Sequence, residues 1–524
     1  MVAFALVSLA TVVALFYAEE NIRGKRAWNS YKRERAAKGE KLSLADFIPP
    51  PVPEEQNLAL CPLLKPILDL DLRPVTEGKI TRWVRGPQLF RDTNGLKRLD
   101  QWNRTWSVVQ YRQTRPRDRK FSTPQGLRTP EPEKLTNGWT DLAGWAAYYR
   151  TGTNLAGVIE STPSATAVLL ALHPLEGDLR ELQREAILRP FARWPVYYVT
   201  NNPWGILLPH LAREVSIVSL LQLRASARLA AGETEEGFAD IELAFRIAES
   251  SRDEPILISQ LVRNNCHRLI SQPFREGLAR HQFSDAQLDE LQKRIGVVDI
   301  LAGYQYAMRG ERGCNSEWER YAREGTADWR SLVEYDDPDD RGKSNMAKYR
   351  AAFMRFAPLG WIYQNQLALC RLYDQFSLPT IDPQRRRVYP EVAAQTDPAV
   401  AQMSGPFSVF PKLLLPAGSA ARKFAHSQTQ LDQALIACAL ERFRLAHGSY
   451  SDTLAPLAPA FLEKIPHDLL SGEPLKYRRT DDGLYVLYSI GWNAKDDGGM
   501  ETKTKAGYPD IESGDWVWRL PSGP

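Results

Sequence analysis

The sequence lacks the compact motifs that mark the common enzyme classes. No HExxH, GxSxG, GxGxxG or Walker A spacing occurs in its 524 residues, which excludes the usual zinc, serine-hydrolase, dinucleotide and P-loop templates. The seven histidines are isolated, and the five cysteines never form a CxxC pair. The sequence therefore predicts no catalytic residues, no disulfide scaffold and no zinc site. Separate buried thiols are expected at Cys61, Cys266, Cys314, Cys370 and Cys438.

A strong charge of one sign is also missing, since the net charge is only +4. Binding to a polyanion would need a local patch. The stretch from Arg104 to Arg128 offers one, because it interleaves arginines with Trp106 and Tyr111. Asp118 and the membrane tether proposed below count against nucleic acid. A solvated basic face near anionic lipid is the better interpretation.

The longest uncharged apolar run is Met1 to Ala18, interrupted only by Ser8 and Thr11. As a helix it would be roughly 27 Å long, enough to span a thin bilayer. The alternative is a cleaved secretory signal. No Lys or Arg precedes the run, and Phe16-Tyr17-Ala18 is a poor cleavage site, so an uncleaved single-pass anchor is predicted.

The orientation of this anchor is open. The segment after it carries many basic residues between Arg23 and Lys41, which by the positive-inside rule favours a cytoplasmic body.

A chain of this length predicts two or three folding units. We expect a mainly α, multidomain protein. The predicted parts are a transmembrane anchor at 1–18, a charged juxtamembrane helix and Pro-rich spacer at 19–54, a mixed strap at 55–135, an irregular helical domain at 136–420 and an α+β module at 421–524.

Within the helical domain, the run Leu220 to Ala231 has helical spacing, Gly232 ends it, and Thr234 starts the next helix. This antiparallel hairpin resembles one tetratricopeptide unit, without a convincing second repeat. In the last module, Leu431, Leu435 and Cys438 are expected on one helix face, and Asp432, Gln433, Glu441 and Arg444 on the other. Residues 475–479 and 484–490 flank an Asp-Gly turn and predict a β-hairpin.

Residues 425 to 518 also resemble a known family. The runs Ala439-Leu440-Glu441-Arg442-Phe443-Arg444, His447-Gly448-Ser449-Tyr450, Ser471-Gly472-Glu473-Pro474-Leu475 and Tyr488-Ser489-Ile490-Gly491-Trp492-Asn493 are similar to the head of type II secretion G-type pseudopilins. In that family the apolar helix directly precedes the head, whereas here it lies at Met1 to Ala18. The chain as a whole, with Glu20-Asn21-x-Arg23-Gly24-Lys25-Arg26-Ala27-Trp28 and the Pro-rich spacer, resembles uncharacterised membrane-anchored proteins of Planctomycetes and Verrucomicrobia. That resemblance implies a periplasmic or otherwise extracytoplasmic body.

The pseudopilin resemblance further implies a calcium ion in the closing loop. Asp496, Asp497, Asp510 and Asp515 would supply oxygen ligands, with Asn493 or backbone carbonyls completing the shell. The alternative is a solvated acidic turn whose residues serve backbone geometry.

A further group of charges, Arg309 to Arg312 with Asp253, Glu254 and Arg263, is expected to form structural ion pairs in the helical domain. The sequence as a whole favours a membrane-anchored interaction or scaffold protein of the cell envelope, with protein partners and no catalytic motif. Two alternatives are an envelope hydrolase whose site is assembled from distant residues, and a type II secretion accessory protein.

Overall fold

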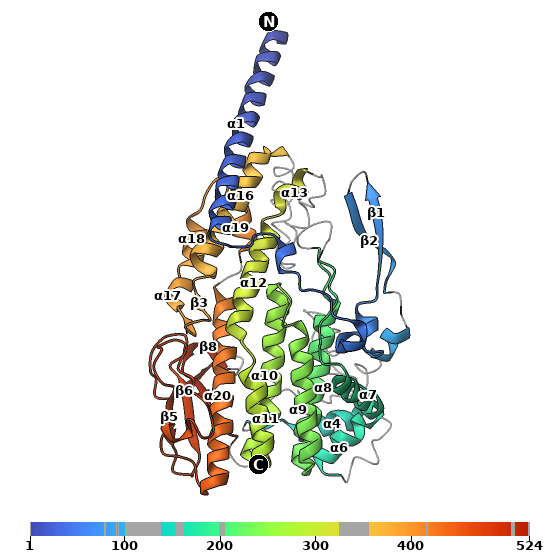
Figure 1. The fold of residues 1–524 in the computed structure, drawn as a ribbon, viewed down its shortest axis with the longest axis vertical. Helices are drawn as coiled ribbons and strands as arrows, with labels where there is room; N and C mark the ends of the chain where they lie inside the picture. Colours follow the sequence, from blue (N-terminus) through green and yellow to red (C-terminus); the bar gives the residue numbers. More distant parts are fainter. Residues whose placement is uncertain are drawn as a thin grey trace.

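A long N-terminal helix rises out of a body of upright helices, so the mainly helical class expected from the sequence is confirmed (Figure 1). The computed structural model describes residues 2–77, 80–90, 92, 94–99, 138–152, 162–198, 205–323, 356–415, 418–504 and 509–521. The helices are α1 (Val2–Ala37), α4 (Leu142–Gly152), α6 (Ser164–Leu172), α7 (Glu176–Leu188), α8 (Pro209–Ala231), α9 (Thr234–Ala248), α10 (Leu257–Ala279), α11 (Asp285–Gly296), α12 (Ile300–Asn315), α13 (Trp318–Arg323), α16 (Leu359–Leu372), α17 (Pro390–Ala393), α18 (Thr396–Gln402), α19 (Val409–Leu414) and α20 (Ser419–His447).

Apart from β1 and β2 the strands have six residues or fewer, and those of the described part of the chain lie in four antiparallel sheets. Their bounds are β1 (Leu70–Glu77), β2 (Ile80–Phe90), β3 (Ile381–Asp382), β4 (Arg387–Val388), β5 (Lys476–Arg479), β6 (Tyr485–Ser489), β7 (Glu501–Lys503), β8 (Pro509–Gly514) and β9 (Trp516–Trp518). The expected C-terminal hairpin is confirmed: β5 pairs with β6, with Lys476 opposite Tyr488 and Arg479 opposite Tyr485. β9 adds to the other edge of β6, a pairing that the sequence did not indicate.

The helical hairpin expected around Gly232 is present as α8 and α9. Gly232 adopts a φ of 85°, a left-handed conformation that suits glycine, and it caps α8. A buried ion pair joins the two helices: the Arg224 guanidinium binds the Asp240 carboxylate, and Arg228 adds a contact of 3.0 Å to the same carboxylate. Nothing about this hairpin identifies a tetratricopeptide repeat.

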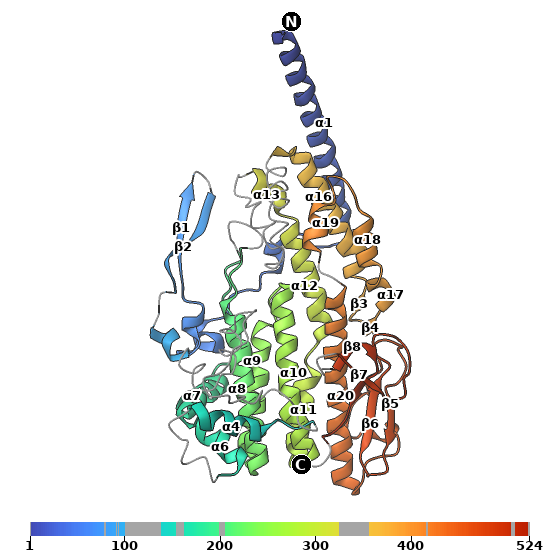
Figure 2. The ribbon, with the colours of Figure 1, turned by 180° about the vertical axis from the view of Figure 1, so that it is seen from behind.

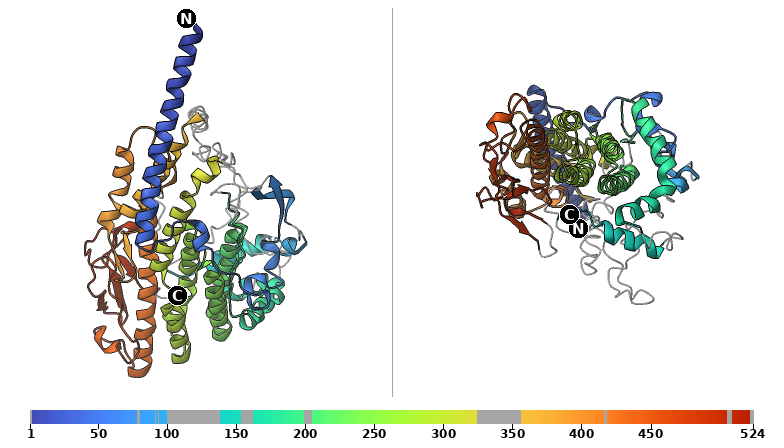
Figure 3. Two further views of the ribbon diagram at one scale, coloured as in Figure 1. Left: turned by 45° about the horizontal axis from the view of Figure 1, so that its top comes forward. Right: turned by 90° about the horizontal axis from the view of Figure 1, so that it is seen from below.

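Helix α10 lies at the centre of the body, in contact with α8, α9, α12 and α20. Figure 3 shows these helices from below, with the C-terminal strands on one side and α4, α6 and α7 on the other. A single cluster of buried apolar side chains extends from Leu58 to Leu520. The boundary expected between residues 420 and 421 falls in the first turn of α20, and α20 packs against α10, α11 and α12. The C-terminal module therefore shares its core with the helical domain.

The polar side chains expected on one face of α20 are largely buried in the structure. Asp432, Gln433 and Glu441 are all buried, at 4%, 1% and 2% exposure. The reason is that α20 is covered on two sides, by the central helices and by the C-terminal strands. Each polar group has a partner there. For example, Asp432 binds Arg386 at 2.6 Å, and Glu441 accepts hydrogen bonds from Arg444, Tyr450 and His281.

The described part of the strap region contains short 3-10 turns and a pair of extended strands. β1 and β2 form a long two-stranded ribbon that stands apart from the helices and points toward the same end of the molecule as α1 (Figure 2). Below it, Leu58, Leu64 and Ile67 anchor short 3-10 turns in the main core. The Arg-rich stretch from Arg104 to Arg128 lies outside the described residues. All five cysteines are buried free thiols, as expected.

Candidate functional site

The most clearly built site is the junction between α1 and the body. Helix α1 continues without a break from its apolar part into its charged part. It is long and apolar enough to cross a membrane, and none of the residues in its apolar window is buried. Further along, Glu20, Gly24, Trp28 and Tyr31 are buried. Their spacing of four, four and three residues places them on one face of the helix. The charged part of α1 is therefore docked against the body.

Two glycines allow the helices to approach closely at this junction. A Cβ atom added at Gly24 would lie 2.7 Å from the Cα of Gly360 in α16, and one added at Gly360 would lie 2.8 Å from the backbone nitrogen of Asn21. Such separations are too short for any real side chain, because both neighbours are backbone atoms. Glycine is therefore required at both positions for α1 and α16 to cross at this distance.

Polar contacts fix the crossing on both sides of the glycines. The Asn21 side-chain oxygen accepts a hydrogen bond of 2.7 Å from the Gly360 backbone N–H, which is otherwise a free donor in the first turn of α16. The Trp361 indole donates to Glu20 at 3.0 Å, and the Tyr17 hydroxyl donates to the Phe356 carbonyl. These contacts join residues about 340 positions apart, in agreement with a fixed junction.

The lower end of the docked helix is held by an aromatic cluster and a shared carboxylate. Trp28 stacks on Tyr31 with ring centroids 5.4 Å apart, and both pack on Cys370 in α16. Asp374 accepts a hydrogen bond of 2.8 Å from Tyr31 and pairs with Arg35 at 3.3 Å. Burial and the neighbouring Cys370 and Asp374 raise the pKa of Tyr31, so the phenol keeps its proton for this bond.

Several of the basic residues that follow the apolar part of α1 form ion pairs in the structure. Arg23 pairs with Glu20 at 2.7 Å, Arg35 with Asp374, and Lys38 with Glu34 at 3.1 Å. Of these pairs, Arg35–Asp374 joins α1 to the body, and Arg23 also reaches the body through the Phe407 ring at 5.8 Å, whereas the Lys38–Glu34 pair is local to the N-terminal segment.

The charges expected around residues 309–312 do not converge on one point. Arg263 pairs with Glu249 at 2.8 Å, Glu254 pairs with His210 at 2.8 Å, and Arg312 pairs with Asp374 and Glu40. Glu311 is alone among them, since its carboxylate accepts the Leu257 backbone N–H at 2.8 Å. Burial raises the pKa of Glu311 to about 7. The separate pairs agree with a structural role.

A buried acid that the sequence did not single out lies between these pairs. Glu214 in α8 is fully buried, and one of its oxygens accepts from the Ser251 hydroxyl at 3.1 Å and lies 3.8 Å from the Cys266 sulfur. Burial first, and then repulsion from Glu254, raises the pKa of Glu214 well above its usual range. Its other oxygen has no hydrogen-bond partner among the residues that the structure describes. A protonated side chain explains how this acid is tolerated in the core.

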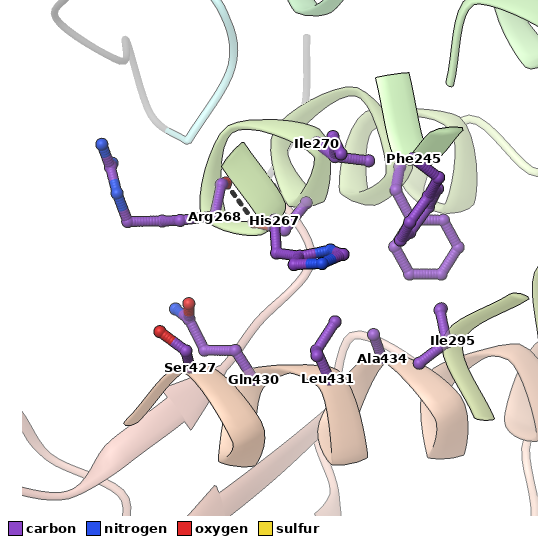
Figure 4. Close-up of a pocket in the computed structure, with 11 residues that line it drawn as sticks. Phe245, His267, Arg268, Ile270, Ile295, Ser427, Gln430, Leu431 and Ala434 are labelled. Atoms are coloured by element: carbon purple, nitrogen blue, oxygen red, sulfur yellow. Dashed lines mark hydrogen bonds between the residues drawn. The ribbon is translucent and has the colours of Figure 1, made fainter. Parts of the chain in front are cut away.

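A cleft lies between α10 and α20, bounded at one end by α9 and α11. It is a narrow gap, partly open to solvent and lined mainly by apolar side chains. Figure 4 shows the His267 ring between the two helices, facing Leu431 and Phe245. The imidazole is 3% exposed and is held by Glu249 at 2.7 Å. Among the described residues that line the cleft there is one histidine and no carboxylate, and Glu249, the partner of His267, is not one of the lining residues.

The four aspartates expected to hold calcium lie in two places: Asp496, Asp497 and Asp515 meet at the loop 496–499, and Asp510 lies in β8. Asp515 closes the loop at 496–499 by accepting from the Asp497 and Gly499 backbone N–H groups at 3.2 and 2.6 Å. Asp496 accepts from Gly498, and that bond lowers its pKa. Asp510 instead binds the Glu512 N–H and the Ser513 hydroxyl, in the strand β8.

Among the residues that the structure describes, no group of three or more His, Cys, Asp or Glu side chains is arranged to hold a metal ion. The observed contacts of the aspartates are those of a hydrogen-bonded turn. Calcium binding therefore stays a prediction, and it would require these carboxylates to exchange backbone partners for the ion.

Comparison with protein-family models, with curated proteins and with solved structures finds no match for the chain. The two family resemblances therefore stay predictions. The junction residues themselves were only partly visible in the sequence. Glu20, Gly24 and Trp28 recur at a spacing that indicates a buried helix face, but nothing local links them to Gly360 and Trp361.

Proposed function

We propose that this chain is a membrane-anchored interaction protein of the cell envelope, whose body is held rigidly on its own anchor helix. The observation that carries the proposal is the continuity of α1: an exposed, uncharged half is followed directly by a half that is docked through Gly24, Trp28 and Tyr31. A flexible tether would not need such a close crossing. A docked helix instead fixes the body relative to the bilayer, which suits a protein that presents a surface to partners.

The shared core extends this proposal to the whole body. Because the C-terminal module and the helical domain have one apolar cluster, a partner bound to either is held relative to the anchor. An enzyme of the envelope would instead need convergent acid–base groups facing a cleft, whereas His267 is the one titratable acid or base that lines the cleft in the described part of the chain apart from Arg268.

We propose that the body is extracytoplasmic. The support for this is the family resemblance, together with the contacts of Arg35 with Asp374 and of Arg23 with Phe407, which give two of the basic residues a role in docking. Protease treatment of intact spheroplasts tests it: digestion of the body from outside is expected, and protection until lysis would place the body in the cytoplasm. The five buried thiols are compatible with either side.

Membrane anchoring and assembly are tested by two further measurements. The full chain is expected to stay in the membrane pellet after carbonate extraction, whereas a variant lacking residues 2–18 is expected in the supernatant. In mild detergent extracts the chain should migrate in a larger assembly than the purified protein does. Migration at the mass of the purified protein alone would contradict an interaction role.

A further inference from the structure

The end of the body around the start of α16 carries a group of aromatic side chains beside the apolar part of α1. We define this aromatic face as Phe16, Tyr17, Phe356, Trp361 and Phe407. Phe16 packs edge-on against Trp361 with centroids 6.1 Å apart, and Trp361 packs edge-on against Phe407 at 6.3 Å. The face thus includes residues from α1, from α16 and from the segment before α19.

The depth of this face in a bilayer follows from helix geometry. Residues 2–18 form about 26 Å of helix at 1.5 Å per residue, close to the roughly 30 Å thickness of the hydrocarbon core. The first charged residues are Glu19 and Glu20. Phe16 and Tyr17 are therefore at the boundary between hydrocarbon and headgroups. The groups that they touch, the Trp361 ring and the Phe356 backbone, must lie at nearly the same depth.

The chemistry of the face fits that depth. Phe356 is 72% exposed, a large apolar surface for a residue at the end of a folded body. Tyr17 and Trp361 are the residue types that favour the headgroup region, where the ring is apolar and the polar atom is hydrogen-bonded. Arg23 lies 5.8 Å above the Phe407 ring and carries a positive charge toward the phosphate level.

We infer that the aromatic face is seated in the headgroup layer of the bilayer, so that the body contacts the membrane surface directly as well as through α1. This inference rests on the proposed membrane anchoring. The occupant of the face is the lipid surface, because the face is continuous with the membrane-spanning part of α1 and the two are fixed together by the Gly24–Gly360 crossing. The body therefore contacts the bilayer at two places, the α1 helix and the start of α16.

The test is the depth of a probe placed at residue 356. The full chain with Phe356→Cys is labelled with an environment-sensitive maleimide and reconstituted into phosphatidylcholine vesicles that carry nitroxide lipids. The unsubstituted chain, whose five cysteines are buried, gives the labelling background. Leu6→Cys reports on insertion of the anchor. Leu445→Cys, in the last turn of α20 at the far end of the body, reports on the aqueous side.

We expect the probe at residue 356 to lose more than half of its emission to a nitroxide at the headgroup, and less to one deep in the acyl chains. The probe at residue 6 should show the reverse preference, and the probe at residue 445 should not be quenched. If residue 6 is quenched while residue 356 behaves like residue 445, the anchor spans the bilayer but the face does not touch it, and the inference is wrong. If residue 6 is not quenched either, the proposed anchoring fails as well.

Discussion

The substitution Gly24→Ala is predicted to release α1 from the body. The added methyl group would lie 2.7 Å from the Cα of Gly360, so one of the two backbones must move. Overpacking of this kind costs about 1–3 kcal/mol, and the upper part of that range applies here because the opposing atoms are backbone and cannot rotate away. The same result is expected for Gly360→Ala, which meets the backbone of α1 from the other side.

The undocking of α1 can be followed through a single thiol. Cys370 is buried and packs beneath Trp28 and Tyr31, whereas the other four cysteines lie in other clusters or in the main core. Local opening of α1 would expose Cys370 to a thiol reagent. A cost of about 2–3 kcal/mol corresponds to roughly 30- to 150-fold faster labelling of Cys370. The assay is the rate of maleimide modification at Cys370, measured by mass spectrometry on the detergent-solubilised full chain.

Gly177→Ala is the matched control. Gly177 lies within α7, and nothing lies within 4 Å of an added Cβ there. This substitution should stabilise the protein by about 0.4–1 kcal/mol, because alanine has less freedom in the unfolded chain. Equal labelling of Cys370 in the Gly24→Ala, Gly360→Ala and Gly177→Ala variants would refute the crossing as the point that fixes the anchor.

Three other predictions concern the body. Asp240→Ala removes the fully buried carboxylate that Arg224 and Arg228 share, leaving Arg224 with the more exposed Glu176 alone, and should cost about 3–5 kcal/mol of unfolding free energy in urea. Glu242→Ala on the same helix should cost under about 1 kcal/mol, and similar losses for both would contradict the ion pair. Glu311 keeps its proton in the folded protein up to a pKa of about 7 but loses it near 4.5 when unfolded, so its contribution to stability falls as the pH rises between those values. Glu311→Gln should therefore raise the melting temperature at pH 8 and leave it nearly unchanged at pH 4. The corresponding gain in unfolding free energy at pH 8 is up to about 3 kcal/mol. An equal effect at both pH values would argue against a buried neutral acid. If calcium binds the closing loop, millimolar calcium should raise the melting temperature of the full chain and Asp515→Asn should remove the shift, while no shift in the unsubstituted protein would exclude the site.

The parts of the fold that the sequence predicted correctly are those encoded by neighbouring residues. Gly232 marks the α8–α9 turn because a left-handed cap favours glycine, and the Asp-Gly turn at residues 482–483 marks the β5–β6 hairpin. The burial of Asp432 and Glu441 could not be predicted in the same way. Both look like a solvated face until Arg386, His281 and Tyr450 are brought from other segments to satisfy them.

The contact between α1 and α16 at the candidate site could be predicted from the sequence even less than the burial of Asp432 and Glu441. The buried face of α1 is periodic, yet its partner in α16 begins more than 300 residues later, and pairing over such a separation is set by tertiary packing. The sequence also favoured a separable C-terminal module, because α20 is long and is followed by strands. In the structure the central helices cover α20 instead.

The C-terminal module shares its apolar core with the central helices, and in this it differs from an independent pilin-like head. A head that moves independently needs its own apolar core, but α20 contributes Leu431, Ala434 and Ile436 to the same cluster that contains the central helices. Removing residues 421–524 would expose that cluster, so the module cannot be detached without loss of the body. Since α1 is in turn packed on α16, the C-terminal strands are connected through α20 and the central helices to the end of the body where α1 docks. The C-terminal module is therefore one side of a single body and not an independent head.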